Sequence, residues 1–194
     1  MDTTSNTLSF AILFMVNNQE VQLRVRQEIF DVIGMERQPS LADKANMSYS
    51  EATVMEILRM ADVAPDGVPH VTKTSQKVGP YVIPAGHTIM PSLTAILKDD
   101  QEWKEPDKFD PGRFLEDGRV KKYEALIPFA AGKRQCPGES LAKAELFLFF
   151  VGLIQRFHFE AIEKGEKIEI VAQPGVSRTP LPTNPIAVTK IRAV

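Results

Sequence analysis

The spacing of apolar positions in the first sixty residues predicts three helices, because glycine and proline hardly interrupt this part of the chain. No proline occurs before Pro39, and Gly34 is the only glycine in this region, so the residues that most often end helices are almost absent. We expect helices from Thr3 to about Val16, from Gln19 to Ile33 and from Ser48 to about Met60. Gly34 then serves as the C-terminal stop of the second helix. The predicted buried stripe of that helix consists of Val21, Val25, Ile29 and Phe30.

The residue pattern changes over residues 64–91, where prolines and glycines separate short apolar runs. The runs Tyr81–Ile83 and His87–Met90 are typical of strands in a small antiparallel sheet. A short helix is expected within Leu93–Trp103, and the stretch Glu105–Asp117 has no regular pattern.

The last third of the chain contains one long apolar run and an alternating tail. Residues from about Glu139 to Phe157 include F-L-F-F-V-G-L-I, which is apolar on every side, so we expect a central, buried helix. From Phe159 onward the alternation predicts strands, with turns at Gly165 and at Pro174–Gly175.

These patterns predict a mainly α protein with small antiparallel β-sheets, an α+β fold, in one domain of 194 residues. Four stretches are expected in order along it. They are a helical part over 1–63, a small sheet and irregular segment over 64–127, a cysteine loop with the buried helix over 128–158, and a β tail over 159–194.

Composition excludes several classes of protein. The chain is 43% hydrophobic and 25% charged with a net charge of -2, which gives no basic field for nucleic acid. A single cysteine cannot form an internal disulfide, and His70, His87 and His158 lack the spacing of zinc ligands. The apolar run Leu8–Val16 is too short to span a bilayer and has no basic flank, so it predicts a buried helix.

The lone cysteine, Cys136, lies in F-A-A-G-K-R-Q-C-P-G at the mouth of the long apolar helix. Pro137 favours a helix start, and Gly132 and Gly138 let another group approach the backbone closely. The positive end of a helix, next to Lys133 and Arg134, favours a thiolate. Such a sulfur is a nucleophile, a metal ligand or merely a buried small apolar group; no neighbouring histidine supplies the base that a nucleophile needs.

The pattern Phe129-x-x-Gly132-x-Arg134-x-Cys136-x-Gly138 resembles the haem-binding loop of the cytochrome P450 family, in its microsomal drug- and steroid-metabolising branch. The resemblance implies that the Cys136 thiolate is the axial ligand of the iron of haem b, with electron donation that favours O–O cleavage. It also implies that Phe129 shields the sulfur. Arg134 is the implied partner of a haem propionate, which its planar fork suits.

A second match is structural. Glu56-Ile57-Leu58-Arg59 reads as a helical pair three residues apart, which by itself is typical of a solvated surface. The family has an E-x-x-R before its small sheet, and Pro106-x-x-Phe109-x-Pro111-x-Arg113-Phe114 is similar to its meander motif. The resemblance implies a buried network of Glu56, Arg59 and Arg113 behind the haem.

Two further matches have simpler readings. By its position alone, His70 in V-P-H-V-T is a turn residue at the start of a strand. The resemblance instead implies that His70 contacts a haem propionate. Asp2-Thr3-Thr4-Ser5 suits a helix cap. In the family, an acid–threonine pair in a long helix guides protons to bound oxygen, which implies catalytic roles for Asp2 and Thr3. Only the end of that motif is present, with Met1 in its variable position.

The matches occur in family order along the whole chain, so the resemblance implies the C-terminal portion of a single P450 domain. It implies a monooxygenase that inserts one oxygen atom of O2 into an apolar small molecule, with electrons from NADPH through a separate flavin reductase. Full-length relatives lie at the cytosolic face of the endoplasmic reticulum membrane, anchored through N-terminal parts that this sequence lacks. Lys121, Lys122, Lys133 and Lys143 are expected to form part of the surface on which the reductase docks. The alternative is that these four lysines are only solvated surface residues.

Two alternatives stay open. The chain is an inactive truncated product or decoy that does not hold haem stably, or it is a haem carrier or sensor without oxygen chemistry. Because the helices over the substrate side of the haem are missing from this sequence, we expect haem binding by the chain alone to be weak or absent.

Overall fold

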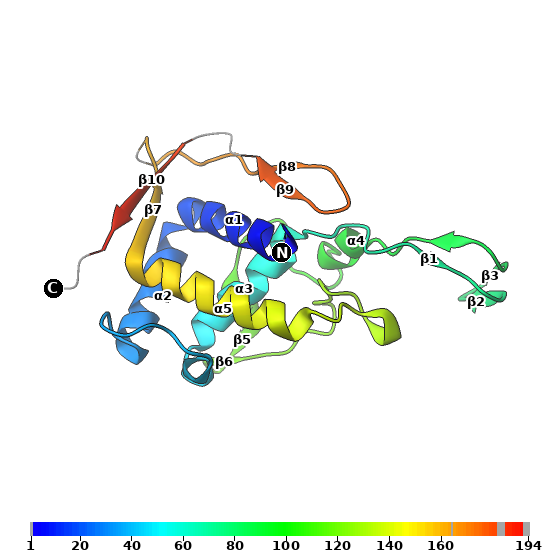
Figure 1. Ribbon diagram of the computed structural model, residues 1–194, viewed down its shortest axis with the longest axis horizontal. Coiled ribbons are helices and arrows are strands. Elements are labelled where there is room, and N and C mark those ends of the chain that lie inside the picture. Colours follow the sequence, from blue (N-terminus) through cyan, green and yellow to red (C-terminus); the bar gives the residue numbers. More distant parts are fainter. Residues whose placement is uncertain (1, 164, 182–184, 192–194) are drawn as a thin grey trace.

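The computed structural model describes residues 2–163, 165–181 and 185–191, and confirms the mainly α, α+β prediction (Figure 1). Helices pack against one another at the centre, and small antiparallel sheets surround them. The helices are α1 (Asp2–Asn17), α2 (Gln19–Val32), α3 (Ser48–Ala61), α4 (Leu93–Leu97) and α5 (Glu139–Arg156), with short 3-10 helices at Leu41–Asn46, Pro111–Phe114 and Gly132–Arg134.

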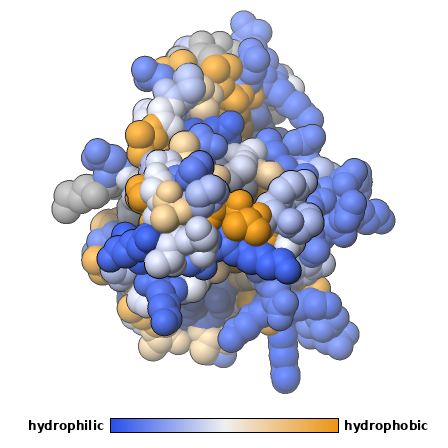
Figure 2. All heavy atoms as spheres, turned by 90° about the vertical axis from the view of Figure 1, so that its right-hand side faces the viewer, coloured by the Kyte–Doolittle hydropathy of each residue, from blue (hydrophilic) through white to orange (hydrophobic). Residues whose placement is uncertain are grey.

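The strands pair two by two in the part of the chain that the structure describes. Each of the following pairs is antiparallel: β1 (His70–Val71) with β4 (Thr88–Ile89), β2 (Gln76–Val78) with β3 (Tyr81–Ile83), β5 (Leu115–Glu116) with β6 (Arg119–Val120), β8 (Val171–Gln173) with β9 (Thr179–Leu181), and β7 (Phe157–Ala161) with β10 (Ile186–Lys190). The β1–β4 and β2–β3 pairs extend away from the helices in Figure 1. On the side that carries them, apolar side chains interrupt a mostly hydrophilic surface (Figure 2).

Helix α1 is the centre of the core, because it contacts α2, α3, α5, β7 and β9. Its second half is almost wholly buried; Met15 has no exposed surface and Val16 is 4% exposed. None of the described helices is both long and apolar enough to cross a membrane.

Polar side chains from distant parts of the chain fix the helix ends. The backbone N–H groups of Tyr49 and Ser50 donate to the Glu28 carboxylate at 2.8 and 2.7 Å, so α2 caps the first turn of α3. Gly34 has a left-handed φ of 76° and donates to the Ile29 carbonyl, as expected of a helix stop.

Two burial predictions are wrong. Phe30 is 60% exposed, because the inner face of α2 is formed by Gln22, Val25 and Ile29, and residue 30 lies about 100° from residue 29 around the helix. Helix α5 is buried along one side only. Leu141 and Phe149 are 65% and 58% exposed, since the described elements pack on the opposite face.

Candidate functional site

The cysteine loop is held by its own backbone. The N–H of Cys136 donates to the Phe129 carbonyl at 2.9 Å, so the chain turns back on itself before α5 begins. The turn requires left-handed backbone at Ala130 (φ 60°) and Gly132 (φ 77°), a conformation that costs little only at glycine. The loop therefore has a defined shape without side-chain support.

This shape leaves the sulfur accessible. Cys136 is exposed and forms no disulfide, and it lies three residues before α5 begins at Glu139. A Cβ at Gly138 would stand 3.8 Å from the Cys136 sulfur, so any side chain there would cover one flank of the sulfur. Phe129 packs against the core beneath the loop, and its ring lies 5.6 Å from the Lys143 ammonium. An open sulfur at the positive end of a helix fits a thiolate metal ligand.

The two residues expected to contact haem propionates, Arg134 and His70, lie in separate elements. Arg134 is exposed and, among the described residues, has no ion-pair or hydrogen-bond partner, so its guanidinium is available to a carboxylate. His70 is half-buried in β1, opposite Ile89 of β4. Within the described chain, no hydrogen bond, ion pair or ring contact joins His70 to the cysteine loop. The sulfur, the glycines and Arg134 thus fit haem locally, and His70 comes from a separate element.

Asp2 and Thr3 lie in the exposed first turn of α1. Their carbonyls accept the hydroxyl groups of Ser5 (2.9 Å) and Thr7 (2.8 Å). Among the described residues, no hydrogen bond or ion pair joins either side chain to the cysteine loop, and Met1 lies outside them. The N-terminal ends of α1 and α5 point to the same side of the molecule (Figure 1).

The structure brings Glu56, Arg59 and Arg113 together. The Glu56 carboxylate accepts from Arg59 at 2.8 and 2.9 Å and from Arg113 Nε at 3.1 Å. The side chains of Glu56 and Arg59 are fully buried, and that of Arg113 is 9% exposed. Other N–H groups of the two guanidiniums donate to the backbone carbonyls of Leu97, Lys104 and Lys108, so the network joins α3 to residues 97–113.

A second buried carboxylate, Asp62, was not found from the sequence. Asp62 ends α3 in a left-handed conformation (φ 42°), and its Oδ2 accepts from Thr94 Oγ1 at 2.5 Å and pairs with Arg178 at 3.1 Å. Burial raises the pKa of Asp62, although Thr94 and Arg178 oppose that shift. The cluster ties the loop after α3 to the turn between β8 and β9. Its only sequence signal is an aspartate where a helix stops.

We expect Asp62→Asn to remove a pH dependence of stability. A raised pKa in the folded state means that the native protein binds more protons than the unfolded chain above about pH 4. The wild-type free energy of unfolding should therefore fall as pH rises through this window, relative to that of Asp62→Asn. Urea titrations from pH 4 upward measure the difference. Asp66→Asn, which removes an exposed carboxylate from the same loop, is the control. A wild-type free energy of unfolding that rises with pH relative to that of Asp62→Asn would contradict the expectation.

The four predicted docking lysines differ in their surroundings. Lys121 pairs with Glu116 at 2.8 Å and Lys143 with Glu139 at 2.5 Å. Lys122 and Lys133 have no ion-pair partner in the part of the chain that the structure describes. Lys122 and Lys143 line the same cavity, between α3, α5 and the segment after β6.

The exposed Cys136 thiol at the start of α5 is therefore the candidate metal ligand of this chain. The sequence model of the family described as Cytochrome P450 matches residues 1–187, and the chain belongs to this family. It is 49% identical over 160 residues to Cytochrome P450 2D27 of Mesocricetus auratus, covering 82% of this chain and 32% of the relative. It is 45% identical over 184 residues to Cytochrome P450 2U1 of Homo sapiens, covering 94% of this chain and 34% of the relative. The chain thus spans about a third of the length of these curated relatives.

Proposed function

We propose that this chain carries the proximal haem site of a haem-thiolate monooxygenase that acts on apolar small molecules. The observation that supports this most strongly is the exposed Cys136 sulfur. It is fixed by the bond from its N–H to the Phe129 carbonyl and lies at the start of α5, in a member of the P450 family. An exposed sulfur at this position is accessible to a metal.

Each site residue has a role in this proposal. Cys136 would hold the iron of haem b, Phe129 would shield the sulfur, and Gly132 and Gly138 would leave room for the macrocycle. Arg134 and His70 would bind its propionates. When bound, haem supplies the activation of O2. Asp2 and Thr3, at the start of α1, would hold and pass the protons that this chemistry consumes.

Electrons would come from NADPH through a separate flavin reductase that docks on Lys121, Lys122, Lys133 and Lys143. Three of these lysines are exposed around the loop and the meander, and Lys143 follows on α5. Such charges accelerate the encounter with an acidic partner. We place the full-length protein at the cytosolic face of the endoplasmic reticulum membrane, as for its microsomal relatives.

A reduced, carbon-monoxide-treated spectrum tests the site. We expect the chain with excess haemin to give at most a weak Soret band of thiolate-ligated haem. A chimera in which residues 2–194 replace the matching third of Cytochrome P450 2D27 should give a full one. Cys136→Ser should abolish the thiolate band in both proteins, because a serine oxygen does not donate electron density to the haem iron as a thiolate sulfur does. Gln135→Ala, an exposed neighbour, is the matched control. A band that survives Cys136→Ser would overturn the assignment.

One observation favours a second candidate, an inactive product that does not hold haem stably. The outer face of α5 carries a groove of about 510 Å³ lined by Leu148, Phe149 and Leu153, an apolar surface that usually needs a cover. A full thiolate band from the chain alone at one equivalent of haemin would rule this candidate out. No band in either the chain or the chimera would favour it.

A further inference from the structure

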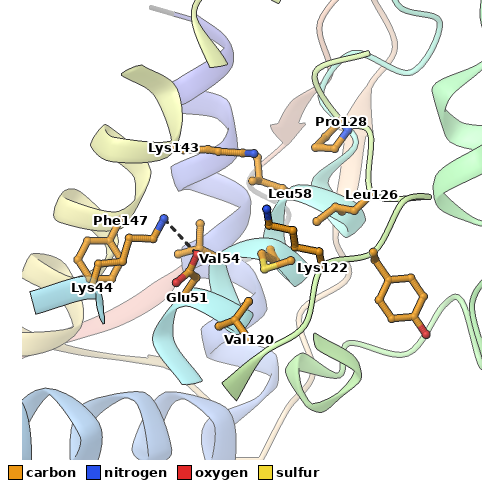
Figure 3. A pocket seen from close by; sticks show the side chains of 12 residues that line it. Lys44, Glu51, Val54, Leu58, Val120, Lys122, Leu126, Pro128, Lys143 and Phe147 are labelled. Carbon is orange, nitrogen blue, oxygen red and sulfur yellow. Dashed lines mark ion pairs between the residues drawn. The ribbon is translucent and has the colours of Figure 1, made fainter. Parts of the chain in front are cut away.

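A cavity of about 540 Å³ lies outside the cysteine loop, between α3, the first half of α5 and residues 120–128 (Figure 3). Its walls are largely apolar. Val54, Leu58 and Phe147 form its inner side and are 7%, 5% and 1% exposed. Leu126 and Pro128, in the segment after β6, line the opposite side. The volume is within the range of small-molecule sites.

The polar groups of this cavity are predominantly cationic. Lys44, Lys122 and Lys143 line it together with one carboxylate, Glu51. Glu51 is engaged by Lys44 at 3.1 Å, and Lys143 is engaged by Glu139 at 2.5 Å. Lys122 has no ion-pair partner among the described residues. In Figure 3 the amino groups of Lys122 and Lys143 extend from opposite sides into the same space.

An apolar wall with an excess of ammonium groups selects among ligand classes. A phosphate or nucleotide would leave the apolar wall without a partner, and no arginine is among the described residues that line the cavity, although phosphate sites favour arginine. A cation would face the lysines, and a neutral hydrocarbon would leave Lys122 unused. A carboxylate with an unbranched hydrocarbon tail fits both parts of the cavity, since the tail can contact the apolar wall and the carboxylate can pair with the lysine ammonium groups.

We propose that this cavity binds a medium-chain acyl carboxylate, with the tail against Leu58 and Phe147 and the head group at Lys122 and Lys143. The proposal does not require haem, because none of the residues that line the cavity lies within residues 129–138. It shares Lys122 and Lys143 with the proposed reductase surface, so the test measures ligand binding and not activity. Each methylene removed from water should raise the affinity by up to roughly fourfold.

Titration of the purified chain with dodecanoate, followed by calorimetry at physiological salt, tests this site. Lys122→Glu should weaken binding by about tenfold, because it places a like charge beside the carboxylate. Lys121→Glu makes the same change in net charge at the adjacent residue, which pairs with Glu116 outside the cavity, and should change the affinity less than twofold. Octanoate should bind at least about tenfold more weakly than dodecanoate.

Two further measurements separate this site from general apolar adsorption. Leu126→Trp narrows the cavity without altering charge and should also weaken dodecanoate binding, with circular dichroism to verify that the variant folds. Dodecyltrimethylammonium has the same tail and the opposite charge, and should bind far more weakly. Equal effects of Lys122→Glu and Lys121→Glu, or equal affinities for the two amphiphiles, would overturn the proposal.

Discussion

Glu56→Gln should lower the free energy of unfolding by about 3–5 kcal/mol, the usual cost of removing one member of a buried ion pair. Both Glu56 oxygens are engaged by Arg59, and one of them also accepts from Arg113 and from the Asp110 N–H at 2.9 Å. Glutamine removes the only carboxylate that the structure places against these two guanidinium groups. Its amide nitrogen would also face a donor. Urea denaturation followed by circular dichroism measures the loss.

Glu116→Gln is the matched control for this variant. It makes the same chemical change in the exposed pair with Lys121, where both side chains reach water, and should cost less than about 1 kcal/mol. If Glu56→Gln cost no more than Glu116→Gln, the carbonyls of Leu97, Lys104 and Lys108 would by themselves be enough to hold the buried arginines.

The helices were predictable because their signals are local. Apolar spacing and the scarcity of proline placed α1, α2, α3 and α5 within a residue or two of their observed ends. Gly34 was predicted to stop α2, and it follows the end of this helix in the left-handed conformation that is typical of a C-terminal glycine. The cysteine loop was singled out by its lone cysteine between two glycines and by the family resemblance of its motif, and its shape comes from backbone turns within ten residues.

Polar contacts between distant segments were not predictable in this way. Gln22, an apparent surface residue of α2, is fully buried because it exchanges hydrogen bonds with the backbone of Phe159. Asp62 meets Arg178, which lies 116 residues away. Gln22 lies three and seven residues before Val25 and Ile29, on the same face of α2, whereas Phe30 is turned about 100° from Ile29. What helical spacing does not show is that the backbone of β7 satisfies the buried Gln22 amide.

The surroundings of Trp103 were not predictable from the sequence either. Helix α4 ends at Leu97, and the Trp103 side chain packs into a second hydrophobic core. This second core is formed by Ala52, Trp103 and Phe114, with Tyr123 and Leu126 packed against it. The sequence shows only one tryptophan after an acidic turn, so apolar periodicity cannot reveal that α3, the segment at Phe114 and residues 123–126 close around it.

Trp103→Ala should therefore lower the free energy of unfolding by about 3–5 kcal/mol, the range for large aromatic side chains deleted from a core. Trp103 is 1% exposed and stacks on Tyr123 with ring centroids 4.9 Å apart. Its ring also lies 5.2 Å from the guanidinium carbon of Arg59, so the deletion weakens the support of the Glu56 network as well. Because the chain has one tryptophan, circular dichroism rather than fluorescence should follow the unfolding.

Trp103→Phe separates the packing from the hydrogen bond. The Trp103 Nε1–H donates to the Ile96 carbonyl at 2.9 Å, and phenylalanine loses this bond while it keeps most of the stacked surface. We expect a loss of about 1–2 kcal/mol for this variant, clearly smaller than for Trp103→Ala. If the two variants lost equal stability, the bond to Ile96, and not the aromatic contacts with Tyr123 and Phe114, would account for the role of the side chain. If neither variant lost more than the exposed-pair control Glu116→Gln, the second core would not contribute to the stability of the fold.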